Sequence, residues 1–447
     1  MILKSINRNL RLISLIIAFF LIGVVVLIVK IYRESSFYII NSNEAVLGYV
    51  YDRRGNILFD QNADPEKYGA DYFTDVANVI GTDTNQMTNT LVSENLQYLN
   101  NYTFSLGSKG SEGKCAIYST LDHEANRAVY DSFQGKNGAA IAYNYKNGDV
   151  YICVSRPGFN PFNGFENLEE GSLLNKSFLK FPPGSTQKIA TLIAARENMS
   201  EELLNSKSYN CSGSYRNAYD QDIICHTPSG HGMQNISQGF SNSCNPFFAQ
   251  LVADPDFSLE DTICSLRNLG YSVNKSTPMK LEINNMTVET ASTVLEDKDE
   301  FSTQWGYIGQ GETMISPCMM MMIQSAIANE NGIAAKPHLI NHTTRIDGTE
   351  DNKVEPEYTE KLFSSETAKY VKDIMITNGA RYTNIAGYSL GLKSGTAQMK
   401  EGKEENSLLT GFDTNPDHPI AFCVLIEDRH SGEVMTDDIV YKILTSL

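Results

Sequence analysis

The chain has 447 residues, which is enough for about two or three domains of ordinary size. Its formal net charge of −17 argues against any partner approached through phosphates, because such binding requires a basic face, so nucleic acid is excluded as an expected ligand. Eight cysteines in so long a chain are too sparse for a disulfide-stapled scaffold.

An apolar segment at residues 12–29 contains one serine and no charge. Its length can cross a hydrocarbon layer about 30 Å thick. Basic residues on both sides show a small excess at the N-terminal side, which favours an N-terminus inside the cell. A cleaved signal peptide is the alternative, but the run is long for one and no small-residue cleavage motif follows. We predict a cytoplasmic stub and single-pass plasma-membrane anchor at 1–34, with later residues outside the cytoplasm.

Residues 35–114 are rich in Asn, Asp and Ser and have few long apolar runs, which predicts a linker and a small N-terminal module. One segment, Gly48–Phe59, alternates apolar and polar residues around an Arg-Gly-Asn turn. This pattern predicts a β-hairpin that packs on the next domain.

From about Cys115 the composition changes, and strand-like runs occur near both ends of the remaining chain. The predicted strands lie at 138–155, as a pair around a Lys-Asn-Gly turn, at 388–393 and at 419–426. Mainly helical patterns lie between them. This order predicts an α+β domain over 115–447, with an antiparallel sheet flanked by helices. The charged stretches 347–360 and 400–406 are predicted to be solvated loops.

The segment Phe181–Ala195 combines a Pro-Pro-Gly turn with an amphipathic helix start. Ser185 is therefore predicted at a helix N-terminus, where unpaired N–H groups favour a developing oxyanion. Lys188 lies on the same face, one turn away. Because a serine hydroxyl is a weak nucleophile without a base, this spacing matters. A lysine serves as that base only where burial or a nearby cation lowers its pKa, so the hypothesis requires a second cation.

Ser-x-x-Lys alone is weak evidence, because it recurs at Ser111, Ser177 and Ser272 and because serine is an ordinary helix N-cap. Downstream, Ser243 and Asn245 place a hydroxyl and an amide two residues apart, a pair that could relay a proton and hold a substrate amide.

The motif Lys393-Ser394-Gly395-Thr396 is more specific, since it occurs once, and it is predicted to end a strand. There the glycine lets a substrate backbone approach closely, and Lys393 supplies the required cation.

Cys211 and Cys225 are the cysteines that look locally paired, and they are followed by His226 and His231. A disulfide, free thiols and a zinc site all remain open for them. His231, between two glycines, is interpreted as a structural hydrogen-bonding residue. The predicted active site contains no metal and no cofactor.

The three motifs, in the order serine-lysine, serine-asparagine and lysine-serine-glycine, resemble the transpeptidase domain of class B penicillin-binding proteins, particularly the small penicillin-binding protein A-like members. The resemblance covers about residues 115–447. Departures are modest: Lys176 follows Asn175 where many relatives have arginine, Ser394 replaces a common threonine, and the N-terminal module is short. Further landmarks that look similar are Asp52–Asn56, Ser155–Pro161, Ser229–Gly232, Gly309–Glu312 with Ser316-Pro317, and Lys393–Gln398.

The resemblance implies a peptidoglycan D,D-transpeptidase that β-lactam antibiotics acylate. Ser185 would be acylated by the penultimate D-Ala of a stem peptide, and Lys188 would take its proton. The backbone N–H groups of Ser185 and Thr396 would form an oxyanion hole. Ser243 would pass a proton to the leaving amine, and Asn245 would hold the substrate amide.

In the same resemblance Lys393 would keep Lys188 neutral, Ser394 and Thr396 would bind the terminal carboxylate, and Gly395 would admit the substrate backbone. A second stem-peptide amine would then resolve the acyl-enzyme, and a separate glycosyltransferase is the expected protein partner. The alternatives are a D,D-carboxypeptidase, a membrane-bound β-lactam sensor or tolerance protein, and a scaffold kept for protein contacts.

Overall fold

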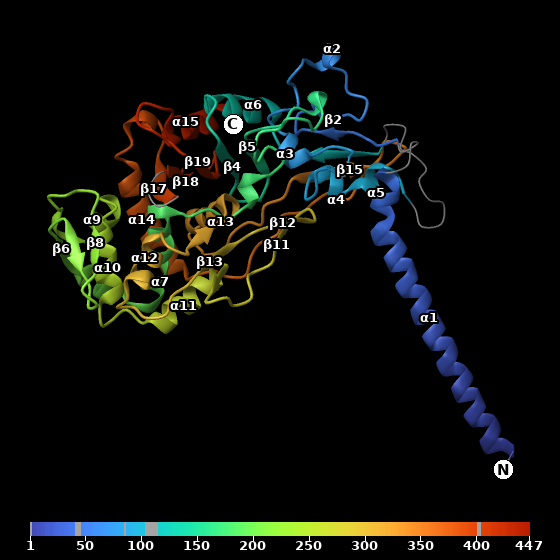
Figure 1. The fold of residues 1–447 in the computed structure, drawn as a ribbon, viewed down its shortest axis with the longest axis horizontal. Coiled ribbons are helices and arrows are strands. Elements are labelled where there is room, and N and C mark those ends of the chain that lie inside the picture. Colours follow the sequence, from blue (N-terminus) through green and yellow to red (C-terminus); the bar gives the residue numbers. More distant parts are fainter. Residues whose placement is uncertain (1, 41–45, 85, 103–114, 400–403) are drawn as a thin grey trace.

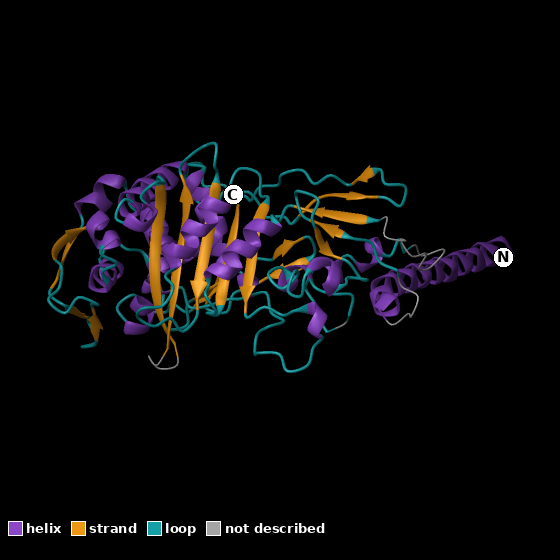
Figure 2. Ribbon diagram, turned by 90° about the horizontal axis from the view of Figure 1, so that it is seen from above, coloured by secondary structure: helices purple, strands orange, loops and turns teal. Residues whose placement is uncertain are grey.

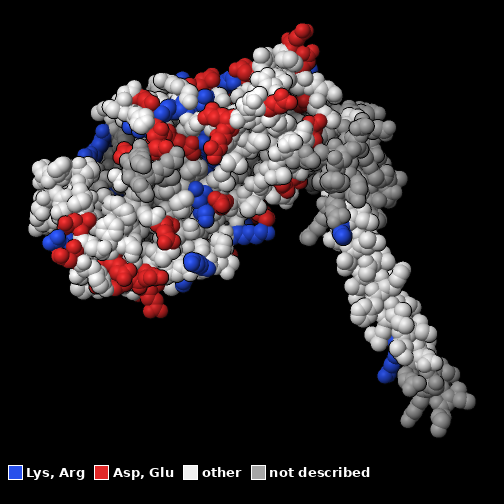
Figure 3. Space-filling view, viewed as in Figure 1, with Lys and Arg blue, Asp and Glu red and all other residues white. Residues whose placement is uncertain are grey.

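The computed structural model describes residues 2–40, 46–84, 86–102, 115–399 and 404–447 (Figure 1). Helix α1 (Ile2–Ile40) projects from the rest of the molecule. Its segment Asn9–Tyr32 contains an 18-residue window with a mean hydropathy of 3.4 and is long and apolar enough to cross a membrane. Figure 3 shows few charged side chains along this helix. Such a helix fits either a membrane anchor or a signal sequence.

The centre of the molecule is a five-stranded antiparallel sheet in the order β17-β18-β19-β4-β5 (Figure 2). Its strands are β4 (Gly138–Asn144), β5 (Val150–Arg156), β17 (Leu390–Met399), β18 (Glu404–Asp413) and β19 (Ile420–Ile426). Side chains alternate between the two faces, so Ala140 and Ala142 of β4 pack into one apolar cluster while Ile141 and Tyr143 pack into another. The predicted antiparallel α+β arrangement is confirmed.

Helices cover both faces of this sheet (Figure 2). One face carries α6 (His123–Ser132) and α15 (Thr436–Ser446), whose apolar side chains share a core with β19. The other face carries α13 (Pro317–Ala328), which is buried on all sides. Next to it lie α14 (Ser365–Gly379), packed along β17, and α7 (Lys188–Asn198). The site described below lies where α7 meets β17.

Two local predictions were wrong. Strand β17 does not end at the lysine-serine-glycine motif but continues to Met399, and Glu404–Asn406, predicted as part of a loop, belong to β18. Both errors have the same cause, because neither segment follows an alternating apolar pattern: β17 is an edge strand, and Glu404–Asn406 extend past the pairing of β18 with β19. Residues 400–403 lie outside the described residues. The stretch 347–360 is mostly irregular, as predicted, with one two-residue strand, β16 (Glu350–Asp351).

The N-terminal region joins a second, five-stranded sheet in the order β16-β15-β3-β1-β2. The predicted hairpin is confirmed as β1 (Val50–Tyr51) and β2 (Ile57–Phe59), which pair antiparallel. Strand β1 also pairs with β3 (Ala116–Ser119), and β3 pairs with β15 (Ile340–Thr344). The short helices of this region are α2 (Pro65–Tyr68), α3 (Ala77–Ile80), α4 (Leu91–Glu94) and α5 (Leu96–Leu99).

Shorter elements complete the chain between β5 and α14. They are η1 (Pro161–Asn163), η2 (Lys176–Phe178), η3 (Gly184–Gln187), α8 (Glu201–Ser206), β6 (Ser208–Cys211), β7 (Ser214–Arg216), β8 (Asp222–Ile224), β9 (Gly232–Asn235), α9 (Ile236–Ser241), α10 (Asn245–Ala253), α11 (Leu259–Asn268), β10 (Tyr271–Val273), β11 (Leu281–Ile283), β12 (Met286–Val288), β13 (Ala291–Thr293), α12 (Phe301–Ile308) and β14 (Met314–Ile315). A further short turn, η4 (Thr383–Ile385), follows α14. Strand β6 pairs with β9, and β7 pairs with β8.

Candidate active site

Ser185 lies in the tight turn η3, which leads directly into α7. The sequence predicted the start of an α-helix at Ser185, whereas the α-helix begins at Lys188 and a 3-10 turn precedes it. Gly184 adopts a φ of +52°, and a Cβ at this position would lie 2.4 Å from the carbonyl oxygen of Thr396. A glycine is therefore required for β17 to pass this close to the turn.

Lys188 is fully buried, and its Nζ lies 2.7 Å from Ser185 Oγ. The same nitrogen lies 2.8 Å from the carbonyl oxygen of Ser243 and 2.7 Å from Asn245 Oδ1. Burial, followed by the charge of Lys393, lowers the pKa of Lys188 well below its ordinary value. A neutral amine donates two hydrogen bonds, here to the two acceptor oxygens. Its lone pair is then free for the proton of the Ser185 hydroxyl.

The second cation that this chemistry requires is Lys393 on β17, which is 1% exposed. Its Nζ donates to Ser243 Oγ at 3.0 Å and to the carbonyl oxygen of Ser394 at 2.7 Å. Burial and the nearby charge of Arg381 lower the pKa of Lys393 to about 7. Since Ser243 Oγ is also 3.5 Å from Lys188 Nζ, this hydroxyl lies between the two amines.

Ser243 lies in the turn that joins α9 to α10, Cys244 follows it, and Asn245 is the first residue of α10. Ser243 has a φ of +52°, a left-handed conformation that is uncommon for residues other than glycine. In this conformation both its carbonyl oxygen and its hydroxyl approach Lys188. The strained backbone is therefore part of the geometry that brings the turn to the lysine.

The edge of β17 that faces η3 offers a further hydrogen-bond donor. The Thr396 carbonyl accepts a hydrogen bond from Gln310 Nε2 at 3.3 Å, on the side away from β18. In an antiparallel strand the N–H and C=O of one residue point to the same side, so the Thr396 N–H points there too. A Cβ on Gly395 would lie 3.1 Å from the Ser185 nitrogen, which places the two backbones in close contact.

Ser185, Ser243, Asn245 and residues 394–396 line one cleft of about 740 Å³. Trp305 and Phe301 line it from α12. Side chains that the motifs did not indicate support it from behind: Tyr382 Oη donates to Ser394 Oγ at 2.7 Å, and aromatic rings underlie both lysines. No short motif marks such supporting residues, because they are ordinary aromatic residues in helices and turns.

The structure brings all eight predicted residues together: six line this cleft, and the two lysines are buried in contact with lining residues. The eight are Ser185, Lys188, Ser243, Asn245, Lys393, Ser394, Gly395 and Thr396. Within the described ranges, one group of side chains has the spacing of metal ligands: Cys211, Cys225, His231 and Cys244. The cysteines at these positions are unbonded thiols.

Comparison with known proteins adds independent evidence. The family model described as penicillin binding protein transpeptidase domain matches residues 138–445. "Stage V sporulation protein D" of Bacillus subtilis is 26% identical over 309 residues, which cover 66% of this chain and 46% of that protein. "Peptidoglycan D,D-transpeptidase PbpA" of Mycolicibacterium smegmatis is 22% identical over 343 residues, which cover 70% of this chain and 67% of the relative. The matched region thus spans about half to two-thirds of these relatives.

Solved structures show the same fold. Penicillin-binding protein A from M. tuberculosis, in its ceftriaxone acyl-enzyme complex, superimposes with a TM-score of 0.76 at 17% identity. The alignment covers 90% of this chain and 98% of that chain. PBP2 of Pseudomonas aeruginosa, in complex with WCK 5153, gives a TM-score of 0.71 at 19% identity and covers 90% of this chain and 96% of its own.

Proposed function

The chain belongs to the penicillin-binding protein transpeptidase family, and from this premise we propose that it is a serine D,D-transpeptidase that cross-links peptidoglycan stem peptides. The observation that carries the proposal is the 2.7 Å contact between Ser185 Oγ and the buried Lys188 Nζ, whose pKa is lowered. This is the arrangement that makes a serine hydroxyl a nucleophile without a histidine.

In the proposed acylation step, Lys188 takes the proton of Ser185 while Oγ attacks the carbonyl carbon of the penultimate D-Ala. The N–H groups of Ser185 and Thr396 stabilise the oxyanion, an interaction often worth about 3 kcal/mol per donor. Collapse of the tetrahedral intermediate breaks the peptide C–N bond. The leaving D-Ala amine receives a proton through Ser243, whose hydroxyl lies between the two amines.

Substrate recognition would fall to the remaining residues of the cleft. Asn245 would hold the substrate amide, Ser394 and Thr396 would bind the terminal carboxylate, and Gly395 would admit the substrate backbone. The amine of a second stem peptide then attacks the ester carbonyl, a new peptide bond forms, and Ser185 recovers its proton. A β-lactam would enter by the same attack, which opens its ring and leaves Ser185 acylated.

We further propose that α1 anchors the protein in the plasma membrane as a single span, with the cleft outside the cytoplasm. Stem peptides reach the enzyme there as part of a glycan made by a separate glycosyltransferase. The described elements that carry the cleft follow α1 in the chain, so one span suffices to place all of them on the same side.

Intact-mass spectrometry after incubation with a fluorescent penicillin tests the proposal. The wild type gains the mass of one ring-opened drug and Ser185→Ala gains none. Ser272→Ala is the matched control, because Ser272 and Lys275 have the same spacing but do not line the cleft. If the wild type forms no adduct, the proposal is overturned and the alternative of a scaffold protein is favoured.

A second assay separates the enzyme classes. A donor peptide that ends in D-Ala-D-Ala is supplied with a labelled D-amino acid as the acceptor. Exchange of the terminal residue supports transpeptidation, whereas hydrolysis alone indicates a carboxypeptidase. Rapid release of penicilloate indicates a β-lactamase, and a stable adduct without any peptide turnover indicates a β-lactam sensor.

A further inference from the structure

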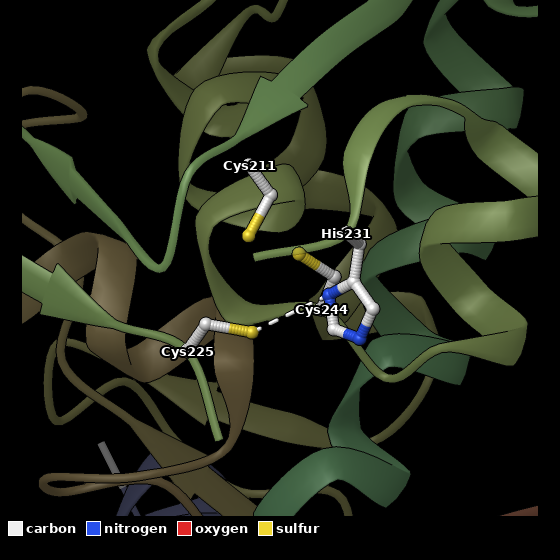
Figure 4. Close-up of side chains that lie close together, drawn as sticks. All are labelled: Cys211, Cys225, His231 and Cys244. Atoms are coloured by element: carbon white, nitrogen blue, oxygen red, sulfur yellow. Dashed lines mark hydrogen bonds between the residues drawn. The ribbon is translucent and has the colours of Figure 1, made fainter. Parts of the chain in front are cut away.

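The side chains of Cys211, Cys225, His231 and Cys244 point toward one another (Figure 4), and Cys244 stands between Ser243 and Asn245 in the chain. The sulfur atoms of Cys211, Cys225 and Cys244 and a ring nitrogen of His231 all lie within 4.8 Å of one another. Cys225 Sγ is 3.4 Å from His231 Nδ1. The three cysteines are buried and His231 is partly buried.

Each of the four comes from a different segment of the chain. Cys211 ends β6, Cys225 follows β8, His231 precedes β9, and Cys244 lies between α9 and α10. In a tetrahedral site with zinc–sulfur bonds of about 2.3 Å, neighbouring sulfurs lie about 3.8 Å apart. The observed spacing therefore needs shifts of less than about 1 Å to close around one ion.

The surroundings of the cluster favour metal ligation. Thr227 Oγ1 lies 3.2 Å from His231 Nε2, so this hydroxyl can accept the Nε2–H and leave the lone pair of Nδ1 facing the sulfurs. Backbone N–H groups also approach the sulfurs, that of Gly213 near Cys211 and that of Thr227 near Cys225. Such hydrogen bonds stabilise bound thiolates.

We propose that Cys211, Cys225, His231 and Cys244 bind one Zn²⁺ ion as a structural site. A disulfide would use two of the three sulfurs and leave one thiol and the histidine without a role, whereas zinc uses all four groups. Three thiolates and one imidazole in tetrahedral array are a typical structural zinc set. On binding, each thiol releases its proton to solvent. The sequence-based expectation of no metal stays a prediction that the same experiment tests.

The ion would hold the catalytic turn in place. Cys244 is flanked by Ser243 and Asn245, both of which contact Lys188. Cys225 is adjacent to Ile224, whose carbonyl accepts a hydrogen bond from Asn245 Nδ2 at 3.3 Å. A metal bound to Cys225 and Cys244 would therefore hold both partners of the hydrogen bond between Ile224 and Asn245 in place. Cys225 also borders the cleft, whereas Cys211, His231 and Cys244 are not among its lining residues, so the site would act by positioning Ser243 and Asn245.

The first test measures the metal content of the full-length protein, purified without chelators, by inductively coupled plasma mass spectrometry. About one zinc per chain is expected in the wild type, as for a structural site. The Cys225→Ser variant should contain no bound zinc. The Cys264→Ser variant should retain the zinc, because Cys264 is an exposed cysteine outside the cluster. Adduct formation at Ser185 is measured separately, so a failure of this proposal is distinguishable from a failure of the proposed function.

Because Cys225→Ser also changes a buried position in the fold, a second test uses the wild type alone. Replacement of zinc by Co²⁺ should produce the visible bands of tetrahedral cobalt together with thiolate-to-cobalt charge transfer. Alkylation of the native protein should spare the three cluster cysteines until a chelator is added. Iron in place of zinc, a disulfide within the cluster, or a metal-free protein whose cluster thiols are all free would each overturn the proposal.

Discussion

The two sides of the cleft are built differently. One side, here called the sheet wall, consists of η3, α7 and β17, and all ten residues of β17 pair with β18. The other side, here called the hairpin wall, is residues 208–245, where β6 and β9 pair over four residues and β7 and β8 over three. The sheet wall carries Ser185, Lys188 and Lys393, and the hairpin wall carries Ser243 and Asn245.

The difference shows which interactions hold the side chains of each wall in position. On the sheet wall a long ladder of backbone hydrogen bonds and a buried core hold the residues. The hairpin wall has too little regular structure for that, and many of its residues are exposed. The turn at Ser243 has two backbone hydrogen bonds to α9 and depends further on side-chain contacts to Lys188, Lys393 and the cysteine cluster.

The largest effect is expected from Lys188→Met, because Lys188 contacts both walls. Loss of the base should slow acylation by a fluorescent penicillin by about 10³-fold, within the range typical of general bases. The Ser243 carbonyl and Asn245 Oδ1 lose their donor in this variant, so thermal stability is measured beside labelling to separate loss of the base from loss of the fold. A loss of labelling below about tenfold would contradict the assignment of Lys188 as the base.

The sheet wall alone is tested by Gly395→Ala. The new Cβ would lie 2.7 Å from the Pro183 carbonyl oxygen and 3.1 Å from the Ser185 nitrogen, so β17 must move away from η3. Because misplacement by about 1 Å can cost about a hundredfold, acylation should slow by that amount. Gly387→Ala is the matched control, as a Cβ there meets nothing within 4 Å. Equal rates for the two variants would show that the close approach is not needed.

The sequence predicted much of the central sheet and part of the sheet wall, but little of the hairpin wall. Strands β4 and β5 were predicted because apolar alternation and a Lys-Asn-Gly turn are local signals. The helix after Pro-Pro-Gly was predicted from its period, although its first turn is tighter than expected. The extent of β17 was missed, because a polar edge strand lacks that pattern.

Other features of the site need the folded chain. The meeting of Ser185, Ser243 and Lys393 was expected from a family resemblance and not from any local pattern. Cys244 was only the middle residue of a Ser-x-Asn triplet, and nothing in the spacing joins it to Cys211. Only the turns between β6 and α10 bring these sulfurs together. Short hairpins held by side chains therefore remain the hardest part to infer.

Metal removal should separate the two walls directly. Chelation of the wild type should lower the rate of acylation at least about tenfold, as loss of supporting interactions typically does. Hydrogen exchange should rise in residues 208–245 and stay unchanged in β17 and β18, whose ladder does not involve the metal. Equal increases in both walls would show that the proposed cross-link stabilises the whole domain and not one side of the cleft.

A smaller effect is expected from Lys393→Met, and it should appear as a shift in pH dependence. Without this cation the pKa of Lys188 rises toward its ordinary value, so the neutral base becomes available only at higher pH. The rising limb of the pH–rate profile should therefore move to higher pH. One pKa unit corresponds to about tenfold in rate on that limb, and we expect less than this. An unshifted profile would show that Lys393 does not act on Lys188.

The smallest effect is expected from Arg381→Gln. This variant should acylate faster than the wild type, whereas Lys188→Met, Gly395→Ala and Lys393→Met should acylate more slowly. Arg381 lowers the pKa of Lys393, so its removal should raise that pKa above about 7. Below pH 7 Lys393 is charged in both proteins. Above pH 7 a larger fraction of Lys393 stays charged in the variant, and this charge holds the pKa of Lys188 down. Acylation should therefore be faster in the variant. The gain should be less than about threefold, because Arg381 is exposed and its charge is screened.

Arg381 also donates hydrogen bonds to Ser241 and Asn242 at the edge of the hairpin wall. Loss of this contact would slow acylation equally at every pH, whereas loss of the charge changes the rate only above pH 7. Added salt distinguishes the two, because it screens the charge in the wild type and leaves the contact in place. A gain above pH 7 that disappears at high salt would show that Arg381 acts across the cleft through charge. A uniform loss would show that it acts as a further tether of the hairpin wall.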